Sequence, residues 1–235
     1  MIRMDVRTIA EITGGHLMQN GASVELQGFS TDSRNLQPGE LFIPLRGDNF
    51  DGHDYMNQAI QNGAAACLSE EMIGGLLVPV IKVNNTLKAL GDLAAAMRRQ
   101  FAGPVVGITG TSGKTTCKEM LAAILESTGP GLKSAGNFNN LIGVPLTLFE
   151  LQPEHRWAVV EMGMSERGEI SRLAEIARPN IGMITNVGAA ARNMDSLSET
   201  LDKFAVPTAF KELQNFDELH RANMNRVFVD FESNP

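Results

Sequence analysis

The stretch Val106–Thr116, VGITGTSGKTT, has the residues of a loop that holds a phosphate group. Phosphate is bound well by backbone N–H groups at a helix N-terminus, where the helix dipole favours negative charge. Gly110 and Gly113 let the backbone turn tightly and approach an anion without a Cβ in the way. Lys114 can reach the β- and γ-phosphates of a nucleotide, and the Thr115 hydroxyl is placed to ligate Mg²⁺. The stretch therefore predicts a nucleotide site; the alternative is a glycine-rich turn that binds nothing.

The residues on either side of this loop predict a strand before it and a helix after it. Residues 105–109, VVGIT, form a short apolar, β-branched run that is typical of a buried strand. Downstream, four apolar residues fall on one helical face: Met120, Leu121, Ile124 and Leu125. Strand, loop and helix thus follow in the order that a phosphate loop requires. One position departs from the general G-x-x-x-x-G-K-[ST] pattern, which has glycine where this chain has Ile108.

Length and composition are those of an ordinary globular enzyme. The chain has 235 residues, enough for one large or two modest domains, with 43% hydrophobic and 20% charged residues. Its net charge of −7 argues against a general nucleic-acid binder, which needs a basic surface to meet the phosphate backbone. No apolar run approaches membrane-spanning length, and the N-terminus lacks the apolar core of a signal peptide. We therefore expect a cytoplasmic protein without nucleic-acid or membrane partners.

The cysteines and one histidine are secondary candidates. Cys67 and Cys117 have no metal-ligand spacing and indicate no disulfide framework. Cys117 follows the phosphate loop closely, so a reactive thiol there is one interpretation, and a buried, inert thiol is the one we favour. His53 lies near a predicted helix start, which favours a capping or surface residue over a catalytic one.

The pattern of segments predicts two α/β domains that divide near residues 101–104, FAGP. Before the division we expect a helix at 6–15, a strand that runs into a polar turn within 24–34, and a strand at 40–47. These are followed by a helix within 52–70 that stops at Gly63, a strand around Cys67 and a helix at 87–101. Pro44 marks the second of these strands as an edge or a bulge. After the division we expect the strand, loop and helix described above, a strand at 156–163, a helix at 168–179 and a strand at 180–188.

This alternation of strands and helices is typical of a mostly parallel sheet covered by helices. The predicted fold class is α/β. A small N-terminal α/β domain, residues 1–102, would be followed by a P-loop-type domain with a mostly parallel sheet, residues 103–235, that is incomplete. No repeats, low-complexity tracts or long linkers interrupt the pattern.

A carboxylate ends the strand that follows the phosphate helix. Glu161 comes directly after WAVV, residues 157–160. In open α/β sheets, ligands collect at the carboxyl ends of the strands, so we expect Glu161 to face the same crevice as the phosphate loop. Mg²⁺ prefers oxygen donors and keeps some of its water, which makes Glu161 a candidate magnesium ligand. The alternative is an exposed carboxylate at a strand end.

Two polar segments are candidates for substrate binding. Residues 134–148 carry three asparagines, Asn137, Asn139 and Asn140, among glycines and before an apolar run. Asparagine is common in turns and helix caps, so the residues alone favour a structural loop over a binding site. Residues 30–34, STDSR, gather hydroxyls, a carboxylate and a guanidinium at one predicted strand end. Turn chemistry explains the first four, whereas Arg34 has the geometry to contact a diphosphate through two hydrogen bonds.

Four segments taken together resemble the Mur ligase family. They are residues 31–55, 107–125, 136–148 and 158–188. The loop with glycine at 110 and none at 108 is that family's own form. Within the family, EMGMSERGEI and GNFNNLIGVPLTL resemble the members that add D-alanyl-D-alanine, not those that add diaminopimelate or lysine. The resemblance runs from about residue 5 to 190.

The resemblance implies a ligase of peptidoglycan precursor synthesis that depends on ATP and Mg²⁺. It would join D-Ala-D-Ala to the carboxylate of UDP-N-acetylmuramoyl-tripeptide through an acyl phosphate. Separately, we expect a monomer. It gives the ATP phosphates to Gly110, Thr111, Ser112, Gly113, Lys114, Thr115 and Thr116, Mg²⁺ to Thr115 and Glu161, and catalytic roles to Lys114 and Glu161. It gives the peptide to Asn137, Asn139 and Asn140, and the UDP moiety to Ser30, Thr31, Asp32, Ser33, Arg34, Arg46, Gly47 and Asp48.

The resemblance breaks near residue 191. The family has a metal-binding histidine where this chain has Ala191, and Lys203 is out of register with the lysine that supports the acyl-phosphate step. We therefore expect residues 191–235 to diverge and the chain as it stands not to ligate at a useful rate. A catalytically inactive protein that binds nucleotide or UDP-sugar is the alternative function. Folylpolyglutamate- and cyanophycin-type ligases share the loop but lack the 31–34 segment, so they rank lower.

Overall fold

The computed structural model describes residues 4–18, 24–166, 168–186 and 227–230. The chain forms two compact units, Met1–Met97 and Arg98–Pro235, each with its own sheet. The predicted α/β class is confirmed. Among the described residues, no helix is both long enough and apolar enough to cross a membrane.

The first unit is built on a five-stranded sheet with the strand order β2-β9-β8-β5-β4. These strands are β2 (His16–Leu17), β4 (Gly28–Ser30), β5 (Glu40–Phe42), β8 (Ala66–Ser69) and β9 (Val80–Lys82). All neighbours are parallel except β2, which runs antiparallel to β9. Two small antiparallel pairs join β1 (Met4–Asp5) to β3 (Glu25–Leu26) and β6 (Arg46–Gly47) to β7 (Phe50–Asp51). Because β4 and β5 are parallel neighbours, the segments that follow them both start from the end of the sheet where the carboxyl ends of these strands lie.

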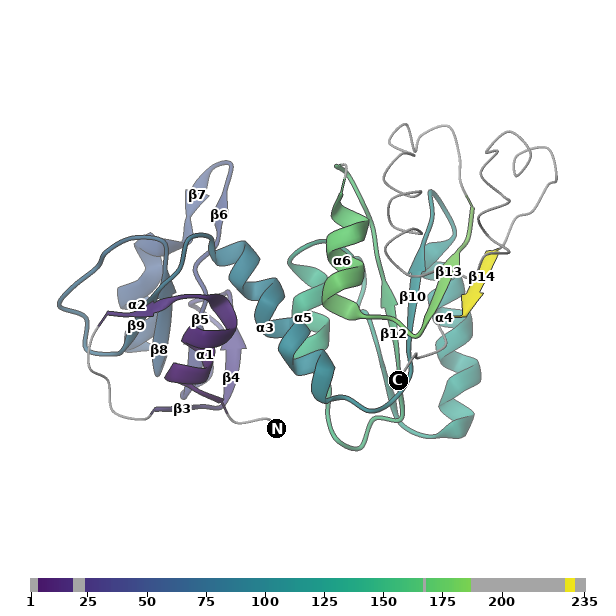
Figure 1. Ribbon diagram of the computed structural model, residues 1–235, viewed down its shortest axis with the longest axis horizontal. Helices are drawn as coiled ribbons and strands as arrows, with labels where there is room; N and C mark the ends of the chain where they lie inside the picture. Colours follow the sequence, from purple (N-terminus) through teal and green to yellow (C-terminus); the bar gives the residue numbers. More distant parts are fainter. Residues whose placement is uncertain (1–3, 19–23, 167, 187–226, 231–235) are drawn as a thin grey trace. The chain divides into compact units, whose positions relative to one another are not determined.

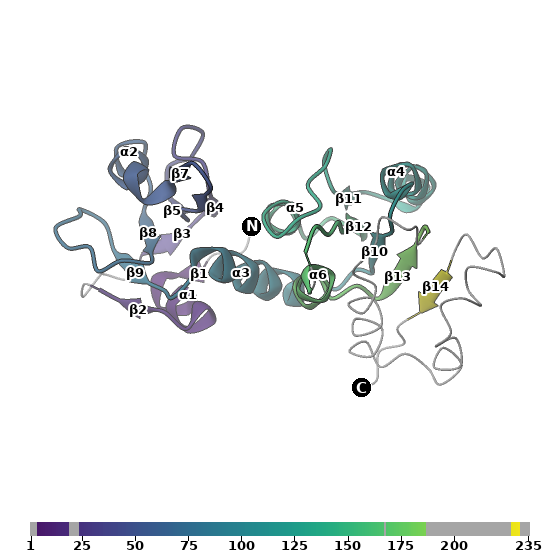
Figure 2. The same cartoon turned by 90° about the horizontal axis from the view of Figure 1, so that it is seen from above.

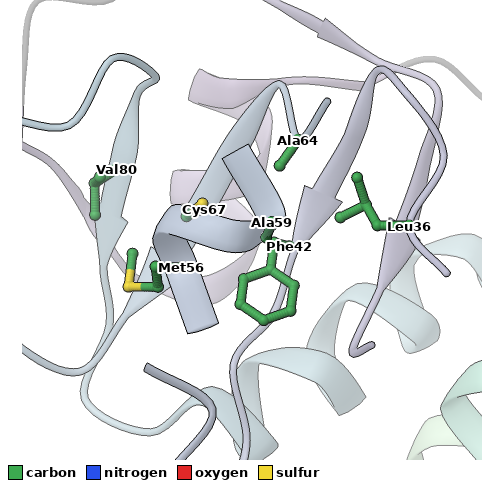
Figure 3. Packing of buried hydrophobic residues seen from close by; sticks show 7 residues of the cluster. All are labelled: Leu36, Phe42, Met56, Ala59, Ala64, Cys67 and Val80. Atoms are coloured by element: carbon green, nitrogen blue, oxygen red, sulfur yellow. The ribbon is translucent and has the colours of Figure 1, made fainter. Parts of the chain in front are cut away.

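Helices lie on both faces of this sheet, with α1 and α2 on opposite sides (Figures 1 and 2). Helix α1 (Val6–Thr13) begins at Asp5, whose side chain accepts a hydrogen bond from the Thr8 N–H, and ends at Gly14 with φ 62°. The 3₁₀ turn Gly52–Tyr55 leads into α2 (Met56–Gln61). Helix α3 (Thr86–Gln100) begins in this unit and ends three residues after its last residue, Met97. Figure 3 shows the core on the α2 face, formed by Leu36, Phe42, Met56, Ala59, Ala64, Cys67 and Val80.

Two details of the first unit differ from the sequence-based expectation. The strand predicted within 24–34 is two short strands, β3 and β4, that belong to different sheets. The strand at 40–47 is not an edge strand, because β5 lies between β4 and β8 and ends at Phe42, before Pro44. Pro44 has no N–H for a ladder hydrogen bond, so it marks the end of the strand rather than a sheet edge. The predicted helix stop is confirmed: α2 ends at Gln61, and Gly63 has φ 105°.

The second unit is built on another five-stranded sheet, with the order β11-β12-β10-β13-β14. The strands are β10 (Val105–Thr109), β11 (Gly131–Lys133), β12 (Trp157–Glu161), β13 (Ile181–Ile184) and β14 (Val227–Asp230). The first four in the sheet are parallel, and β14 runs antiparallel to β13. The predicted mostly parallel sheet is therefore confirmed, while β14 is absent from the sequence-based expectation. Strand β10, which precedes the phosphate loop, lies in the middle of the sheet.

Three helices cover this sheet in two layers, with α4 on one face and α5 and α6 on the other (Figures 1 and 2). They are α4 (Lys114–Leu125), which continues into the 3₁₀ turn Glu126–Thr128, α5 (Gly143–Phe149) and α6 (Glu169–Ala177). The apolar face predicted for α4 is only half buried. Leu121 and Leu125 pack against the core, whereas Met120 and Ile124 are 60% and 66% exposed. The side chains that α4 buries completely are those of Lys118 and Ala122.

Candidate functional site

The phosphate loop lies at the carboxyl end of the central strand of the second unit, between β10 and α4. Gly110 has φ 136° and Gly113 has φ 80°, both in the region that favours glycine. A Cβ on Gly110 would clash with Thr185 Oγ1 and lie 2.9 Å from the Asn186 carbonyl oxygen. Gly113 precedes α4 and supplies no side-chain cap. The first turn of a helix leaves N–H groups without intrahelical partners, so this helix start is suited to an anion.

The loop is held in shape by two residues that follow β13. Thr185 Oγ1 donates to the Ser112 carbonyl oxygen at 2.6 Å, and the Asn186 side chain exchanges two hydrogen bonds with Ser112, at 2.8 and 2.9 Å. The Thr111 N–H donates to the Asn186 carbonyl oxygen at 3.1 Å. Sequence reasoning missed Thr185 and Asn186, although two polar residues at the end of a buried strand were a usable signal. Asn186 engages the N–H groups of Thr111 and Ser112, and the Cys117 N–H donates to the Gly113 carbonyl oxygen. The N–H groups from Gly113 to Thr116 are therefore the candidates for binding an anion.

Lys114 folds back over its own loop. Its Nζ donates to the Gly110 carbonyl oxygen at 2.8 Å. The ammonium group is therefore held at the loop, with its other two N–H groups able to donate to an anion there. Thr116, on the same first turn of α4, is exposed.

Glu161 is buried at the end of β12 and meets the first turn of α4. It is 2% exposed, which excludes the alternative of an exposed carboxylate at a strand end. Its Oε2 accepts from Thr115 Oγ1 at 2.9 Å, and its Oε1 accepts from Asn139 Nδ2, also at 2.9 Å. Its backbone N–H donates to Ser134 Oγ at 3.0 Å. The structure thus brings three predicted site residues together from three separate segments.

Thr115 and Glu161 fit a magnesium ion. Two neighbouring ligand oxygens of an octahedral Mg²⁺ at about 2.0–2.1 Å stand about 2.9 Å apart, which matches the distance between Thr115 Oγ1 and Glu161 Oε2. Among the described residues, no group of three His, Cys, Asp or Glu side chains gathers to form an all-protein metal site. One carboxylate and one hydroxyl are the sparse protein ligand set that Mg²⁺ has when phosphates and water complete its shell.

Lys118 is a buried neighbour of this cluster that sequence reasoning missed. Its side chain is completely buried, and Nζ donates to the Gly136 carbonyl oxygen at 3.1 Å. The same Nζ lies 3.6 Å from Glu161 Oε2 and 3.4 Å from Glu119 Oε1. The available signal was its position, one turn after Lys114 and one turn before Ala122 on the buried side of α4.

The three candidate asparagines have three different environments. Asn139 reaches Glu161, as described above. Asn140 Oδ1 accepts from the N–H groups of Ile142 and Gly143, at 3.1 and 2.8 Å, and so caps the start of α5. Asn137 is exposed, and its carbonyl oxygen accepts from the Asn139 N–H. Of the three, Asn139 contacts Glu161. Asn140 has the structural role that the sequence favoured for these asparagines.

In the first unit, Asp32 and Arg34 form an ion pair just after the end of β4. Arg34 Nε and Nη2 donate to the two Asp32 carboxylate oxygens at 2.9 and 3.0 Å. These bonds to the Arg34 side chain, with one from its backbone N–H, lower the pKa of Asp32 to about 2. The Arg34 side chain is 77% exposed, so it remains open to a further anion.

The other residues of this segment support the turn. Ser30 Oγ bonds to the backbone of Asp32. Ser33 is 6% exposed, its Oγ donates to Gln58 Oε1, and its carbonyl oxygen accepts from Asn62 Nδ2. Thr31 is half-buried. Ser33 therefore faces the interior, which leaves Arg34 as the outward-facing candidate.

Arg46 is surrounded by carboxylates. Its guanidinium contacts Asp51 at 2.8 Å, Glu71 at 2.7 Å and Glu70 at 3.2 Å. An incoming anion would have to compete with these three partners, which disfavours Arg46 as a simple phosphate ligand. Two further candidates, Gly47 and Asp48, are exposed beside it at the β6–β7 hairpin.

His53 and Cys67 are interior residues. The prediction of a capping or surface residue is wrong in both alternatives, because the His53 side chain is 5% exposed and the residue that caps the 3₁₀ turn is Asp51. Its Nε2 accepts from the Glu70 N–H at 3.0 Å, which places the ring proton on Nδ1, where it faces Asp51 Oδ1 at 2.5 Å. Cys67 is buried, and burial raises its pKa to about 12. Cys117 is half-buried on α4. Ala191 and Lys203, where divergence was expected, lie outside the described residues.

Comparison with known proteins places both units in one family. Residues 25–98 match the profile described as "Mur ligase family, catalytic domain", and residues 108–196 match "Mur ligase middle domain". A Synechocystis UDP-N-acetylmuramoyl-tripeptide–D-alanyl-D-alanine ligase is 44% identical over 79% of this chain and 41% of its own length.

Solved structures agree. A crystal structure of MurF from Acinetobacter baumannii aligns with a TM-score of 0.78 at 34% identity, over 85% of this chain and 45% of that one. MurF from Thermotoga maritima in complex with ADP aligns with a TM-score of 0.66 at 31% identity, over 74% and 42%. The chain spans about two fifths of the length of the curated relatives that it matches. By its two matching domains and these relatives, the chain belongs to the Mur ligase family.

Proposed function

We propose that this chain carries the ATP site and the UDP-substrate site of a ligase that joins D-Ala-D-Ala to UDP-N-acetylmuramoyl-tripeptide. The observation that carries the proposal is the meeting of Thr115 with Glu161 beside the phosphate loop, since this arrangement matches a magnesium-bound triphosphate. The names of the relatives, and the ADP in the related Thermotoga structure, support it.

The chemistry divides among the residues as follows. A carboxylate is a poor acyl donor, so ATP first phosphorylates it to an acyl phosphate, and the amine of the dipeptide then displaces inorganic phosphate. In this proposal the N–H groups at the start of α4 and the Lys114 ammonium hold the β- and γ-phosphates. Thr115 and Glu161 would hold Mg²⁺, which neutralises phosphate charge. The protein's share of the catalysis is then positioning and electrostatic stabilisation.

The substrate roles follow the surroundings of each candidate. Asn139 is proposed to act at the peptide end, because its amide lies beside Glu161. Arg34 is proposed for the diphosphate of the UDP moiety, because its guanidinium is exposed and has N–H groups beyond those that pair with Asp32. Ser33 and Asn140 would act indirectly, through the turn and the helix cap that they hold.

We further propose that the protein acts as a cytoplasmic monomer on these small molecules, without nucleic-acid or membrane partners. ATP and UDP-linked precursors are both soluble nucleotides, and the net charge of −7 disfavours binding to a polyanion. Size-exclusion chromatography coupled to light scattering tests the monomeric state. A mass well above the 25.4 kDa of one chain would contradict it.

Calorimetric titration of the purified chain with ADP and Mg²⁺ tests the nucleotide site. We expect binding that Lys114→Ala abolishes and that Lys133→Ala leaves unchanged, because Lys133 pairs with Glu119 away from the loop. Unchanged affinity in Lys114→Ala would mean that the nucleotide binds elsewhere. The full reaction is tested by phosphate release from ATP that requires both UDP-N-acetylmuramoyl-tripeptide and D-Ala-D-Ala.

A further inference from the structure

Lys118 is a completely buried cation on α4, and the proposed chemistry gives this residue no role. Burying an ammonium group is costly unless charges and hydrogen bonds compensate it, and an apolar residue of similar volume is often at least as stabilising. The side chain nevertheless points into the interface between α4 and the segment 134–140. Its surroundings therefore indicate what it does there.

Lys118 joins three parts of the site. Its Nζ donates to the Gly136 carbonyl oxygen at 3.1 Å, which ties α4 to the loop that carries Asn139. The same Nζ lies 3.6 Å from Glu161 Oε2, the oxygen that also accepts from Thr115. Lys118 thus lies between the phosphate helix, the asparagine loop and the carboxylate at the end of β12.

Lys118 lies within ion-pair distance of two carboxyl groups, those of Glu161 and Glu119. Glu161 is 2% exposed, and Lys118 is the cation in contact with it among the described ion pairs. Glu119 also faces Lys118, at 3.4 Å, and pairs with the partly exposed Lys133 at 2.5 Å. Two lysine side chains therefore face two glutamates. The contact with Lys118 offsets part of the cost of burying Glu161 in the free protein.

The loop depends on the same contacts. The Asn139 side chain reaches Glu161 Oε1, and the Asn139 carbonyl oxygen accepts from the Gly163 N–H at 2.7 Å. At its start the loop is held to β12, because the Ser134 N–H donates to the Val159 carbonyl oxygen and Ser134 Oγ accepts from the Glu161 N–H, both at 3.0 Å. At Gly136, where a Cβ would meet nothing within 4 Å, the bond from Lys118 ties the loop to α4.

We propose that Lys118 is a positioning residue that couples the nucleotide site to the asparagine loop. By holding Gly136 and Glu161 together, it makes residues 134–140 respond when a nucleotide orders the start of α4. This inference rests on the proposed function, because it takes the nucleotide as one ligand and the loop as the place of the other. Lys118 contacts neither ligand directly.

Hydrogen–deuterium exchange on the purified chain, free and with ADP and Mg²⁺, tests the coupling. In the wild type we expect ADP to slow exchange at 110–116 and also at 134–140. In Lys118→Met, which keeps the length and removes the charge, ADP should still slow exchange at 110–116 but no longer at 134–140. In the free state, exchange at 134–140 should rise about tenfold or more, because a charge-assisted hydrogen bond is lost. Lys118→Arg should restore the coupling.

Lys133→Met is the matched control, because it removes a nearby lysine that contacts Glu119 but neither Gly136 nor Glu161. It should keep the coupling. Two results would overturn the proposal. One is that ADP still slows exchange at 134–140 in Lys118→Met, and the other is that bound ADP does not slow exchange at 134–140 in the wild type. If Lys118→Met does not fold, Lys118→Gln replaces it, because a glutamine side chain is too short to reach both Gly136 and Glu161. ADP should then slow exchange at 110–116 but not at 134–140 in Lys118→Gln. If the wild type binds no ADP, the proposed function fails, and the free-state comparison alone decides whether Lys118 anchors the loop.

Discussion

The Thr115 hydroxyl donates a 2.9 Å hydrogen bond to Glu161 Oε2, although 46 positions separate the two residues. Thr115 lies in the first turn of α4, and Glu161 is the last residue of β12. Strand β12 is the direct parallel neighbour of β10, which leads into the phosphate loop. The register pairs Ile108 with Glu161, so β10, which ends at Thr109, and β12, which ends at Glu161, finish within one residue of each other. Sheet pairing thus sets the distance between these two proposed magnesium ligands.

Glu161→Gln should remove most of the effect of Mg²⁺ on nucleotide affinity. The amide keeps the shape and one acceptor oxygen but loses the charge that a hard cation prefers. We expect ADP affinity with Mg²⁺ to fall by about tenfold or more, equivalent to about 1.4 kcal/mol, with little change in EDTA. Calorimetry under both conditions measures this, and Glu119→Gln is the control. The same Mg²⁺ dependence as in the wild type would show that Glu161 is not a ligand.

Gly110→Ala should destabilise the second unit and weaken nucleotide binding. A Cβ there clashes with Thr185 Oγ1 and lies 2.9–3.0 Å from backbone atoms of Asn186, which cannot easily move. Overpacking of this kind costs about 1–3 kcal/mol. Gly75→Ala is the control, since Gly75 also has positive φ, +82°, but open space around it. Urea denaturation compares the two; equal losses would mean that the Thr185–Asn186 contact is easily displaced.

The Asp32 carboxyl should titrate near pH 2 in the folded protein. Arg34 lowers its pKa to about 2 from the ordinary aspartate value of 3.8, so the folded state binds the proton less readily than the unfolded one. The resulting stabilisation is full above about pH 4 and is lost as the pH falls through about 2. NMR titration of the Asp32 side chain measures the pKa. In Arg34→Gln the pKa of Asp32 should rise toward 3.8. An unchanged pKa would show that hydrogen bonds from backbone N–H groups alone keep it low.

Cys67 should resist thiol reagents in the native protein. Burial raises its pKa to about 12, so at pH 8 only about one molecule in ten thousand carries the thiolate. The folded state favours the protonated thiol, so this stabilisation is full below the ordinary cysteine pKa of 9.0 and is lost as the pH rises toward 12. In Cys117→Ser, a disulfide reagent should label no thiol until the chain is unfolded. Rapid labelling of that variant would mean that the first unit opens readily.

Part of the fold could be predicted from the sequence because its causes are local. Glycines, a lysine and a threonine at fixed spacing predict the phosphate loop, with a β-branched run before it and a helical pattern after it. Positive φ at Gly110 and Gly113 is what those residue types permit most easily. The helix stop at Gly63 and the fully buried strand β12 have the same kind of origin.

The predictions that failed depended on neighbours far along the chain. Pro44 suggests an edge strand from the sequence, but strand order depends on which segments pair, and β5 has a partner on each side. The apolar face of α4 should match its buried face by periodicity alone, yet Lys118 is buried while Ile124 is 66% exposed. The strands β10, β12 and β13, against which α4 packs, and the 134–140 loop decide which side of that helix is covered.

Short-range residue patterns were enough to predict the α/β class, the loop at 106–116 and the family. Which candidates meet depends on contacts between distant segments: Asn139 rather than Asn137 reaches Glu161, Asn140 caps a helix, and Lys118 and Asn186 join the site. Residue type limits what a side chain can donate or accept. Its partner is fixed by strand pairing and helix packing, which bring distant segments within hydrogen-bonding distance.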